Sequence, residues 1–143
     1  MIRIGIASDH AGFTNKEEIK KRLISQGYTI TDFGSHSCES IDYPDVAHPL
    51  AIAVELGKVS MGIALCGTGN GINMTLNKHQ GVRSALCWAP EIATLARKHN
   101  DANICALPAR FIDLEVVFEV IDAFLHASFE GGRHQKRVEK IPC

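Results

Sequence analysis

The sequence lacks paired cysteines: it has no CxxC motif, and its five cysteines are an odd number. Disulfide scaffolds and structural zinc sites both depend on paired cysteines, so neither is expected here. Cys87 and Cys105 lie within apolar runs, where a free cysteine acts as a small buried hydrophobic residue. His36 and Cys38 in "HSC" have no second pair of ligands to complete a metal site. We expect no metal centre.

The chain also lacks a long hydrophobic run and an excess of either charge. No stretch approaches the roughly 20 apolar residues that a membrane span needs, and the apolar part of "MIRIGIASDH" is too short for the core of a signal peptide. Lys and Arg number 15 and Asp and Glu number 16, a net charge of -1. That balance has no basic excess for nucleic acid and no polybasic patch for a membrane surface. We expect a cytoplasmic protein that binds neither nucleic acid nor a membrane.

Two nucleotide-binding signatures are missing, although a glycine-rich loop is present. A P-loop needs Lys followed by Ser or Thr after its glycines, but Gly71 is followed by Ile72 and Asn73. The dinucleotide fingerprint places G-x-G-x-x-G in the first βα turn, where this chain has "SDHAG". Without those glycines, Asp32 is interpreted as a turn residue and not as a ribose ligand. NAD and ATP are both disfavoured, and we expect no cofactor.

What the sequence does contain is a regular alternation of short apolar runs and longer helical patterns. A chain of 143 residues with 45% hydrophobic residues is long enough for one domain with a sizeable core. The apolar runs are nearly continuous, as is typical of parallel strands covered on both faces. Strands are expected at 2–8, 28–33, 60–66, 82–87 and 103–107. Helices are expected at 15–26, 44–57, 70–79, 90–99 and 113–127.

Five βα units with short joints predict an α/β fold, a three-layer αβα sandwich with a five-stranded parallel sheet. In the first helix, Ile19 and Leu23 share an apolar stripe, whereas Lys16 and Lys20 lie on the polar side. No linker, internal repeat or low-complexity segment interrupts the chain, so residues 1–143 are expected to form a single domain.

A ligand-binding or active site is expected beyond the carboxyl ends of the strands, near the point where the strand order reverses. The first strand runs into "SDHAGF" and the third into "CGTGNG". In a doubly wound sheet these two strands are commonly neighbours, so the two loops should face each other. Asp9 and His10 would then lie opposite Cys66 and Thr68.

The cysteine that opens "CGTGNG" has a specific chemical use in this position. Unpaired N–H groups at a helix N-terminus favour the thiolate over the thiol. The N–H groups of Gly67, Gly69 and Gly71 could also hold an oxyanion that develops on a substrate. Together with the Thr68 hydroxyl, these groups suit proton abstraction next to a carbonyl. A buried cysteine before a tight turn is the alternative, and the loop alone leaves both open.

Two motifs later in the chain contain further candidate site residues. "ARKHNDAN" ends a helix with His99 and Asn100, although histidine also suits the negative end of a helix for purely structural reasons. "EGGRHQKRVEKIPC", the tail from about residue 130, places Arg133 and Arg137 four residues apart, on one face if helical. Two such arginines can bind a phosphate. The tail is otherwise a solvated basic end or a segment that packs on another subunit.

His99 and Cys66 are expected at opposite edges of the sheet. Cys66 follows a strand, whereas His99 ends a helix that runs back before the strand 103–107. A strand of five or six residues is about 17–20 Å long, too far for one imidazole to reach across. If both residues act in one site, a neighbouring subunit supplies one of them, and a two-fold dimer does so twice.

Taken together, "SDHAGF", "DYPD", "CGTGNG", "HNDAN" and "EGGRHQKRV" resemble the ribose-5-phosphate isomerase B family, which includes the galactose-6-phosphate isomerase subunits. The match spans nearly the whole chain, in order and at matching spacing. The resemblance implies a Rossmann-like fold, a homodimer or dimer of dimers, and no metal. It also implies an aldose–ketose isomerase that interconverts ribose 5-phosphate and ribulose 5-phosphate in the non-oxidative pentose phosphate pathway.

The same resemblance assigns roles to individual residues. Cys66 is the base that moves a proton between C2 and C1, and His99 helps to open the furanose ring. Thr68 and the loop 67–71 support the enediolate. The remaining implied substrate contacts are Asp9, His10, Tyr43, Gly67, Gly69, Asn70, Gly71 and Asn100 for the sugar, with Arg110, Arg133 and Arg137 for the phosphate.

One position departs from the family pattern. Pro108 in "ALPAR" stands where the family usually has glycine, two residues before the expected phosphate ligand Arg110. The exact sugar also stays open at this stage. A hexose-6-phosphate isomerase for allose or galactose phosphate is one alternative, and a non-catalytic sugar-phosphate-binding protein is another.

Overall fold

Five apolar segments form one parallel sheet in the computed structural model, which describes all residues 1–143. The strand order is β2-β1-β3-β5-β4, so the order reverses beside β1 and β3, as expected for a doubly wound sheet. Each strand boundary lies within two residues of its expected position. The strands are β1 (Arg3–Ser8), β2 (Thr29–Asp32), β3 (Met61–Cys66), β4 (Ser84–Leu86) and β5 (Ile104–Pro108).

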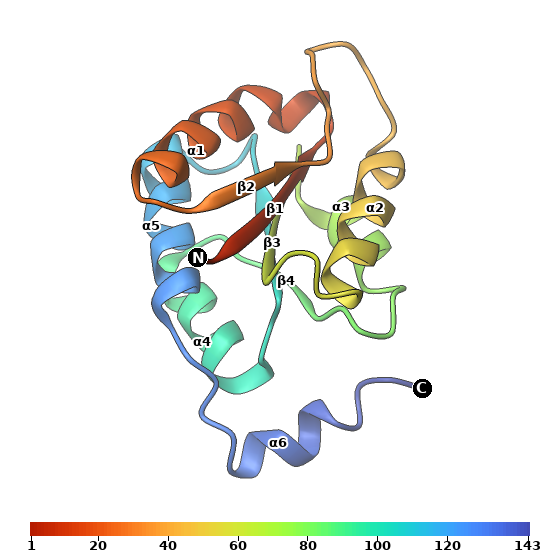
Figure 1. Ribbon diagram of the computed structural model, residues 1–143, viewed down its shortest axis with the longest axis vertical. Coiled ribbons are helices and arrows are strands. Elements are labelled where there is room, and N and C mark those ends of the chain that lie inside the picture. Colours follow the sequence, from red (N-terminus) through yellow and green to blue (C-terminus); the bar gives the residue numbers. More distant parts are fainter.

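Helices cover both faces of this sheet. The helices are α1 (Phe13–Ser25), α2 (Tyr43–Glu55), α3 (Asn70–Leu76), α4 (Pro90–Asn100), α5 (Leu114–His126) and α6 (Arg133–Val138), with a short 3-10 turn at His10–Gly12. Figure 1 shows α1, α4 and α5 on one side of the sheet and α2 and α3 on the other. The predicted three-layer α/β sandwich is therefore confirmed. No helix combines the length and the apolar character that a membrane crossing requires.

Alternate strand residues build two separate cores. Ile4 and Ile6 belong to the cluster formed with α1, α4 and α5, whereas Ala7 belongs to the cluster formed with α2 and α3. This follows from the two-residue period of a strand, which sends successive side chains to opposite faces. Cys87 and Cys105 are fully buried in the first cluster, as expected. The hydrogen bond with Cys87, together with burial, raises the pKa of the Cys105 thiol well above its ordinary value.

The tail forms a short helix on its own chain. α6 contacts the last part of α4, and His134 and Val138 on α6 are buried. In Figure 1, α6 lies at the lower end of the molecule, opposite to the loops that follow β1 and β3. The segment with Arg133 and Arg137 is helical, so the two arginines share one face of α6.

One lysine that the helical pattern assigns to the surface is buried. Lys16 of α1 is fully buried, and its Nζ donates to Asp32 Oδ2 at 2.5 Å and to Glu17 Oε1 at 3.1 Å. Lys20 Nζ donates to the same Asp32 oxygen at 2.6 Å. The surface assignment of Lys16 is wrong because a carboxylate at the end of β2 gives its ammonium group a charged partner inside the fold. Asp32 itself accepts a hydrogen bond from Gly34 N–H at 2.9 Å, as a turn residue does.

We expect Asp32→Asn to destabilise the fold at neutral pH. Burial alone would raise the pKa of Asp32, but hydrogen bonds from Lys16, Lys20 and the Gly34 N–H hold it below its ordinary value. Removing one partner of a buried pair leaves Lys16 poorly compensated, so the free energy of unfolding should fall by on the order of 3 kcal/mol. Urea unfolding at pH 7 measures this loss.

The pH dependence and a matched variant test the cause. A lowered carboxyl pKa stabilises the fold above the unfolded-state value of about 3.9, and this stability is lost as pH falls through the folded-state pKa. The difference between wild type and Asp32→Asn should therefore shrink below about pH 4. Glu18→Gln removes the exposed partner of Lys21 and should change nothing measurable. An equal loss of unfolding free energy in both variants would contradict the assignment of Asp32 as the stabilising partner of Lys16.

Candidate active site

The loops after β1 and β3 lie side by side at the carboxyl edge of the sheet. The register pairs Ser8 with Leu65, and the Asp9 N–H donates to the Leu65 carbonyl oxygen at 3.3 Å. Asp9 is buried, and its Oδ1 accepts hydrogen bonds from Ala11 and Gly12 N–H at 2.9 and 3.3 Å. One carboxylate oxygen thus fixes the local turn. The expected meeting of the two loops is confirmed.

Cys66 ends β3 and opens a loop with free backbone donors. Its side chain is buried, with 4% of the residue exposed. The N–H groups of Gly67, Gly69 and Gly71 donate to no acceptor within the chain. Gly69 has a φ of 75°, in the left-handed region that favours glycine, so the chain can turn sharply into α3 here. The loop therefore combines a thiol with unpaired N–H groups.

Thr68 within this loop and Tyr43 beside it shape the site. The Thr68 Oγ1 accepts a hydrogen bond from the Asn70 N–H at 3.2 Å, which ties the turn together. The Tyr43 ring at the start of α2 packs directly on Gly71, where a Cβ would lie 2.7 Å from the Tyr43 hydroxyl oxygen. Glycine at position 71 is therefore required for the tyrosine to approach. The His10 Nδ1 accepts a hydrogen bond from the Ile41 N–H at 3.3 Å, in the segment that leads to Tyr43.

Arg110 joins the same edge from β5. The Ala109 N–H donates to the Cys66 carbonyl oxygen and the Arg110 N–H to the Gly67 carbonyl oxygen, both at 3.0 Å. The Arg110 side chain passes over Gly67, 3.4 Å from where a Cβ would be. Pro108 is the last residue of β5 and is paired with Cys66. Because the strand ends there, the missing N–H of proline does not interrupt the hydrogen bonding of the sheet. Proline at this position thus leaves Arg110 beside the cysteine loop.

A cavity of about 280 Å³ opens at this edge next to the loop. Its lining adds aromatic side chains that the sequence patterns did not single out. Trp88 and Phe111 are exposed, at 54% and 72%, and the loop residues Thr68 and Asn70 form the polar part of the wall. The full lining is Thr68, Asn70, Leu86, Trp88, Pro108 and Phe111.

The remaining predicted residues lie at the opposite edge. His99 and Asn100 end α4 just before the amino end of β5, and Ile104 of β5 is level with Gly62, four residues before Cys66. Arg133 and Arg137 lie on α6, which packs on that end of α4. Within one chain, the structure therefore brings together one set of predicted residues: Asp9, His10, Tyr43, Cys66, the loop 67–71 and Arg110. It does not bring His99, Asn100, Arg133 and Arg137 to this set.

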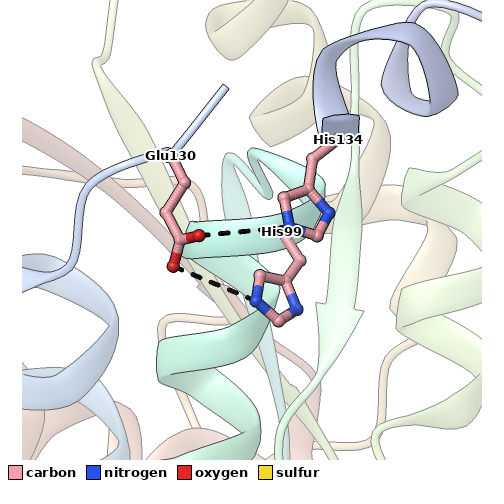
Figure 2. A group of neighbouring side chains, drawn as sticks. All are labelled: His99, Glu130 and His134. Carbon is pink, nitrogen blue, oxygen red and sulfur yellow. Dashed lines mark ion pairs between the residues drawn. The ribbon is translucent and has the colours of Figure 1, made fainter. Parts of the chain in front are cut away.

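His99 has two neighbours from the tail that sequence reasoning missed. Figure 2 shows Glu130 and His134 beside it. The His99 and His134 rings stack with centroids 4.2 Å apart, and the Glu130 carboxylate lies 4.0 Å from the Nε2 of each ring. The only local signal in the sequence is the glycine pair after Glu130, which can reverse the chain.

Comparison with known proteins decides the family. A family model described as Ribose/Galactose Isomerase matches residues 4–141. The chain belongs to the ribose/galactose isomerase family. Family members of similar length cover almost all of it: ribose-5-phosphate isomerase B of Escherichia coli is 45% identical over 141 residues, which are 99% of this chain and 95% of that protein.

Two further family members bear on fold and substrate. The crystal structure of ribose-5-phosphate isomerase B from Mycoplasma genitalium with bound ribulose-5-phosphate has a TM-score of 0.94 at 41% identity, covering 98% of this chain and 93% of that chain. The D-erythrulose-4-phosphate isomerase of Pectobacterium atrosepticum is 44% identical over 142 residues, 99% of this chain and 93% of that protein. The family thus includes isomerases of phosphorylated sugars of different length.

Proposed function

We propose that this chain is a ribose-5-phosphate isomerase, which interconverts D-ribose 5-phosphate and D-ribulose 5-phosphate. One observation carries the proposal: the buried Cys66 lies beside the unpaired N–H groups of its loop, in a chain 45% identical to ribose-5-phosphate isomerase B. A thiolate and preorganised N–H donors are what proton transfer next to a carbonyl needs. We assign the reaction to the non-oxidative pentose phosphate pathway and to the cytoplasm, where phosphorylated sugars are retained by their charge.

The proposed reaction only relocates protons: from the anomeric hydroxyl to the ring oxygen, from C2 to C1, and from the C2 hydroxyl to the C1 oxygen. His99 promotes opening of the furanose ring by proton transfer to the ring oxygen, which exposes the C1 aldehyde. The Cys66 thiolate then removes the proton from C2, and the electron pair moves into an enediolate. The N–H groups of Gly67, Gly69 and Gly71, with the Thr68 hydroxyl, stabilise its oxygen. Cys66 returns the proton to C1, the C2 hydroxyl loses its proton and the C1 oxygen gains one, which gives the ketose.

The remaining predicted residues hold the substrate in this proposal. Asp9, His10, Tyr43 and Asn100 bind sugar oxygens, as does Asn70 of the loop 67–71. Arg110 lies next to Gly67 and binds the phosphate together with Arg133 and Arg137. A guanidinium group offers paired donors that match phosphate oxygens.

The separation of Cys66 from His99 leads us to propose a homodimer with shared sites. β3 has six residues, so its first and last Cα atoms lie about 17 Å apart. A second copy of the chain would bring His99 and the arginines of α6 to Cys66, and the two-fold axis would repeat this at a second site. In this arrangement the single domain 1–143 packs its tail, about residues 130–143, on its partner.

A second candidate substrate is a four-carbon sugar phosphate, because the D-erythrulose-4-phosphate isomerase is nearly as similar to this chain. Steady-state turnover of four-, five- and six-carbon sugar phosphates separates these activities. We expect the highest kcat/KM for ribose 5-phosphate, and little turnover of unphosphorylated ribose because it lacks the group that the arginines bind. A higher kcat/KM for D-erythrulose 4-phosphate or for allose 6-phosphate would replace the proposed substrate. Binding without any turnover would indicate a sugar-phosphate-binding protein.

A further inference from the structure

Three titratable side chains meet at the end of α4, away from the group around Cys66. The rings of His99 and His134 stack with centroids 4.2 Å apart and planes 10° from parallel. One oxygen of the Glu130 carboxylate lies 4.0 Å from His99 Nε2, and the other lies 4.0 Å from His134 Nε2. Figure 2 shows the carboxylate beside both rings. Of the three residues, only His99 has a part in the proposed reaction.

The backbone of the tail fixes this arrangement. Gly131 and Gly132 have φ angles of 65° and 54°, values that glycine adopts at little cost and other residues rarely adopt. The chain reverses there, so residues on both sides of the turn face α4. The Glu130 N–H donates to the Lys98 carbonyl oxygen at 3.0 Å, and the His134 N–H donates to the Gly131 carbonyl oxygen at 3.0 Å. His134 is buried, with 9% of the residue exposed.

The orientation of the rings argues against a metal site at these residues. Two histidines and a glutamate are suitable ligands for a transition metal, and their ligand atoms lie within 4.8 Å of one another. However, the lone pair of an imidazole nitrogen lies in the plane of its ring. Two stacked, nearly parallel rings cannot direct both lone pairs at one ion. Stacking does restrict the plane and the position of each ring, which points to an orienting role.

We propose that His134 and Glu130 are positioning residues for His99 in the opening of the sugar ring, an inference that rests on the proposed function. His134 holds the plane of the His99 ring by stacking against it. Glu130 stabilises the imidazolium form of His99 between the two proton transfers. Catalytic groups must be held to within about 0.5 Å of their productive position, and neighbouring side chains provide that restraint.

The charges around the rings suit this division of roles. Burial first, and then the positive charges of His99 and Arg133, lower the pKa of His134, which favours the neutral form of its ring. Glu130 is the one carboxylate within 4.0 Å of the His99 ring. At His134, the charges of Arg133 and Arg137 on α6 lower the pKa and the charge of Glu130 opposes them. Helix α5, which also packs on α4, contributes no ion pair to His99.

Two substitutions at position 134 test the stacking. We expect His134→Leu to lower kcat for ribose 5-phosphate about 10-fold with little change in KM, since misplacement of a catalytic group slows the chemical step. His134→Phe keeps a flat ring and should retain most of the rate. His126→Leu is the matched control, because His126 hydrogen bonds only within α5, to the Asp122 carbonyl oxygen. Equal losses in the Leu and Phe variants would overturn the stacking role.

A double-substitution experiment asks whether His134 acts through His99. In a His99→Asn background, His134→Leu should change the residual rate less than about 2-fold, because the residue that it positions is gone. The same 10-fold loss in both backgrounds would show an independent or merely structural effect and would overturn the proposal. The ring-proton signals of His99 in NMR spectra should also lose a ring-current shift in His134→Leu. An unchanged His99 signal would mean that the rings do not stack in solution.

Glu130→Gln tests the electrostatic part. Removing the carboxylate disfavours the imidazolium form, so the limb of the pH profile of kcat/KM that is absent in His99→Asn should move to lower pH by a few tenths of a unit, as expected for an exposed partner. Glu139→Gln, an exposed change on the same tail, should leave the limb in place. An unmoved limb in Glu130→Gln would overturn this part. The NMR measurement of the His99 signals in His134→Leu does not need turnover. Failure of the proposed function would instead appear as a wild type that is inactive on every sugar phosphate, so the two failures can be told apart.

Discussion

Cys66→Ser is expected to lower kcat for ribose 5-phosphate by about 10² to 10⁴, the usual contribution of a general base. Serine fits the buried position at the end of β3, but its hydroxyl does not ionise at neutral pH, so it cannot remove the C2 proton. The fold should persist, because the loop geometry is set by the glycines and by Thr68. Steady-state kinetics, with circular dichroism to check folding, measures the effect.

Chemical modification tests the role of Cys66 independently. Iodoacetamide should inactivate the wild type, and ribose 5-phosphate should protect it. Cys38 and Cys143 are exposed and will also react, so the modified residue must be identified by mass spectrometry. Cys38→Ser is the matched control and should be fully active. If Cys66→Ser were as active as the wild type, the base would be another residue.

The second large effect is expected from mixing two inactive variants. Cys66→Ser and His99→Asn chains should each be nearly inactive, and their mixture should regain about a quarter of wild-type activity after subunit exchange, since half of the dimers are mixed and each mixed dimer has one intact site. This follows from the position of Cys66 and His99 at opposite ends of the sheet. Activity is measured before and after exchange at equal chain concentrations.

A mixture with the doubly substituted chain provides the control. When wild type exchanges with a Cys66→Ser, His99→Asn chain, each mixed dimer has one fault in each shared site, so only about a quarter of the sites remain intact. Sites contained within single chains would leave about half of them intact. Mixed dimers that form without any gain in the first experiment would exclude the shared site.

Much of the fold follows from patterns within short stretches of the sequence. The apolar runs and the helical stripes located all five strands and the first five helices, because their periodicity depends on residues only two to four positions apart. The rule that ligands bind at the carboxyl ends of parallel strands then placed Asp9 beside the Cys66 loop. The return direction of α4 placed His99 at the other edge. These inferences need only the order of the elements.

Other features depend on contacts between residues far apart in the chain, and only the tertiary structure decided them. Lys16 is buried because Asp32, sixteen positions away, lies next to it across the α1–β2 packing. Arg110 keeps its place beside Gly67 because Pro108 falls on the last position of β5. The stacking of His134 on His99 depends on how the glycine turn directs α6 onto α4. Local periodicity cannot specify such contacts, because it carries no information on which side chains meet once the elements have packed.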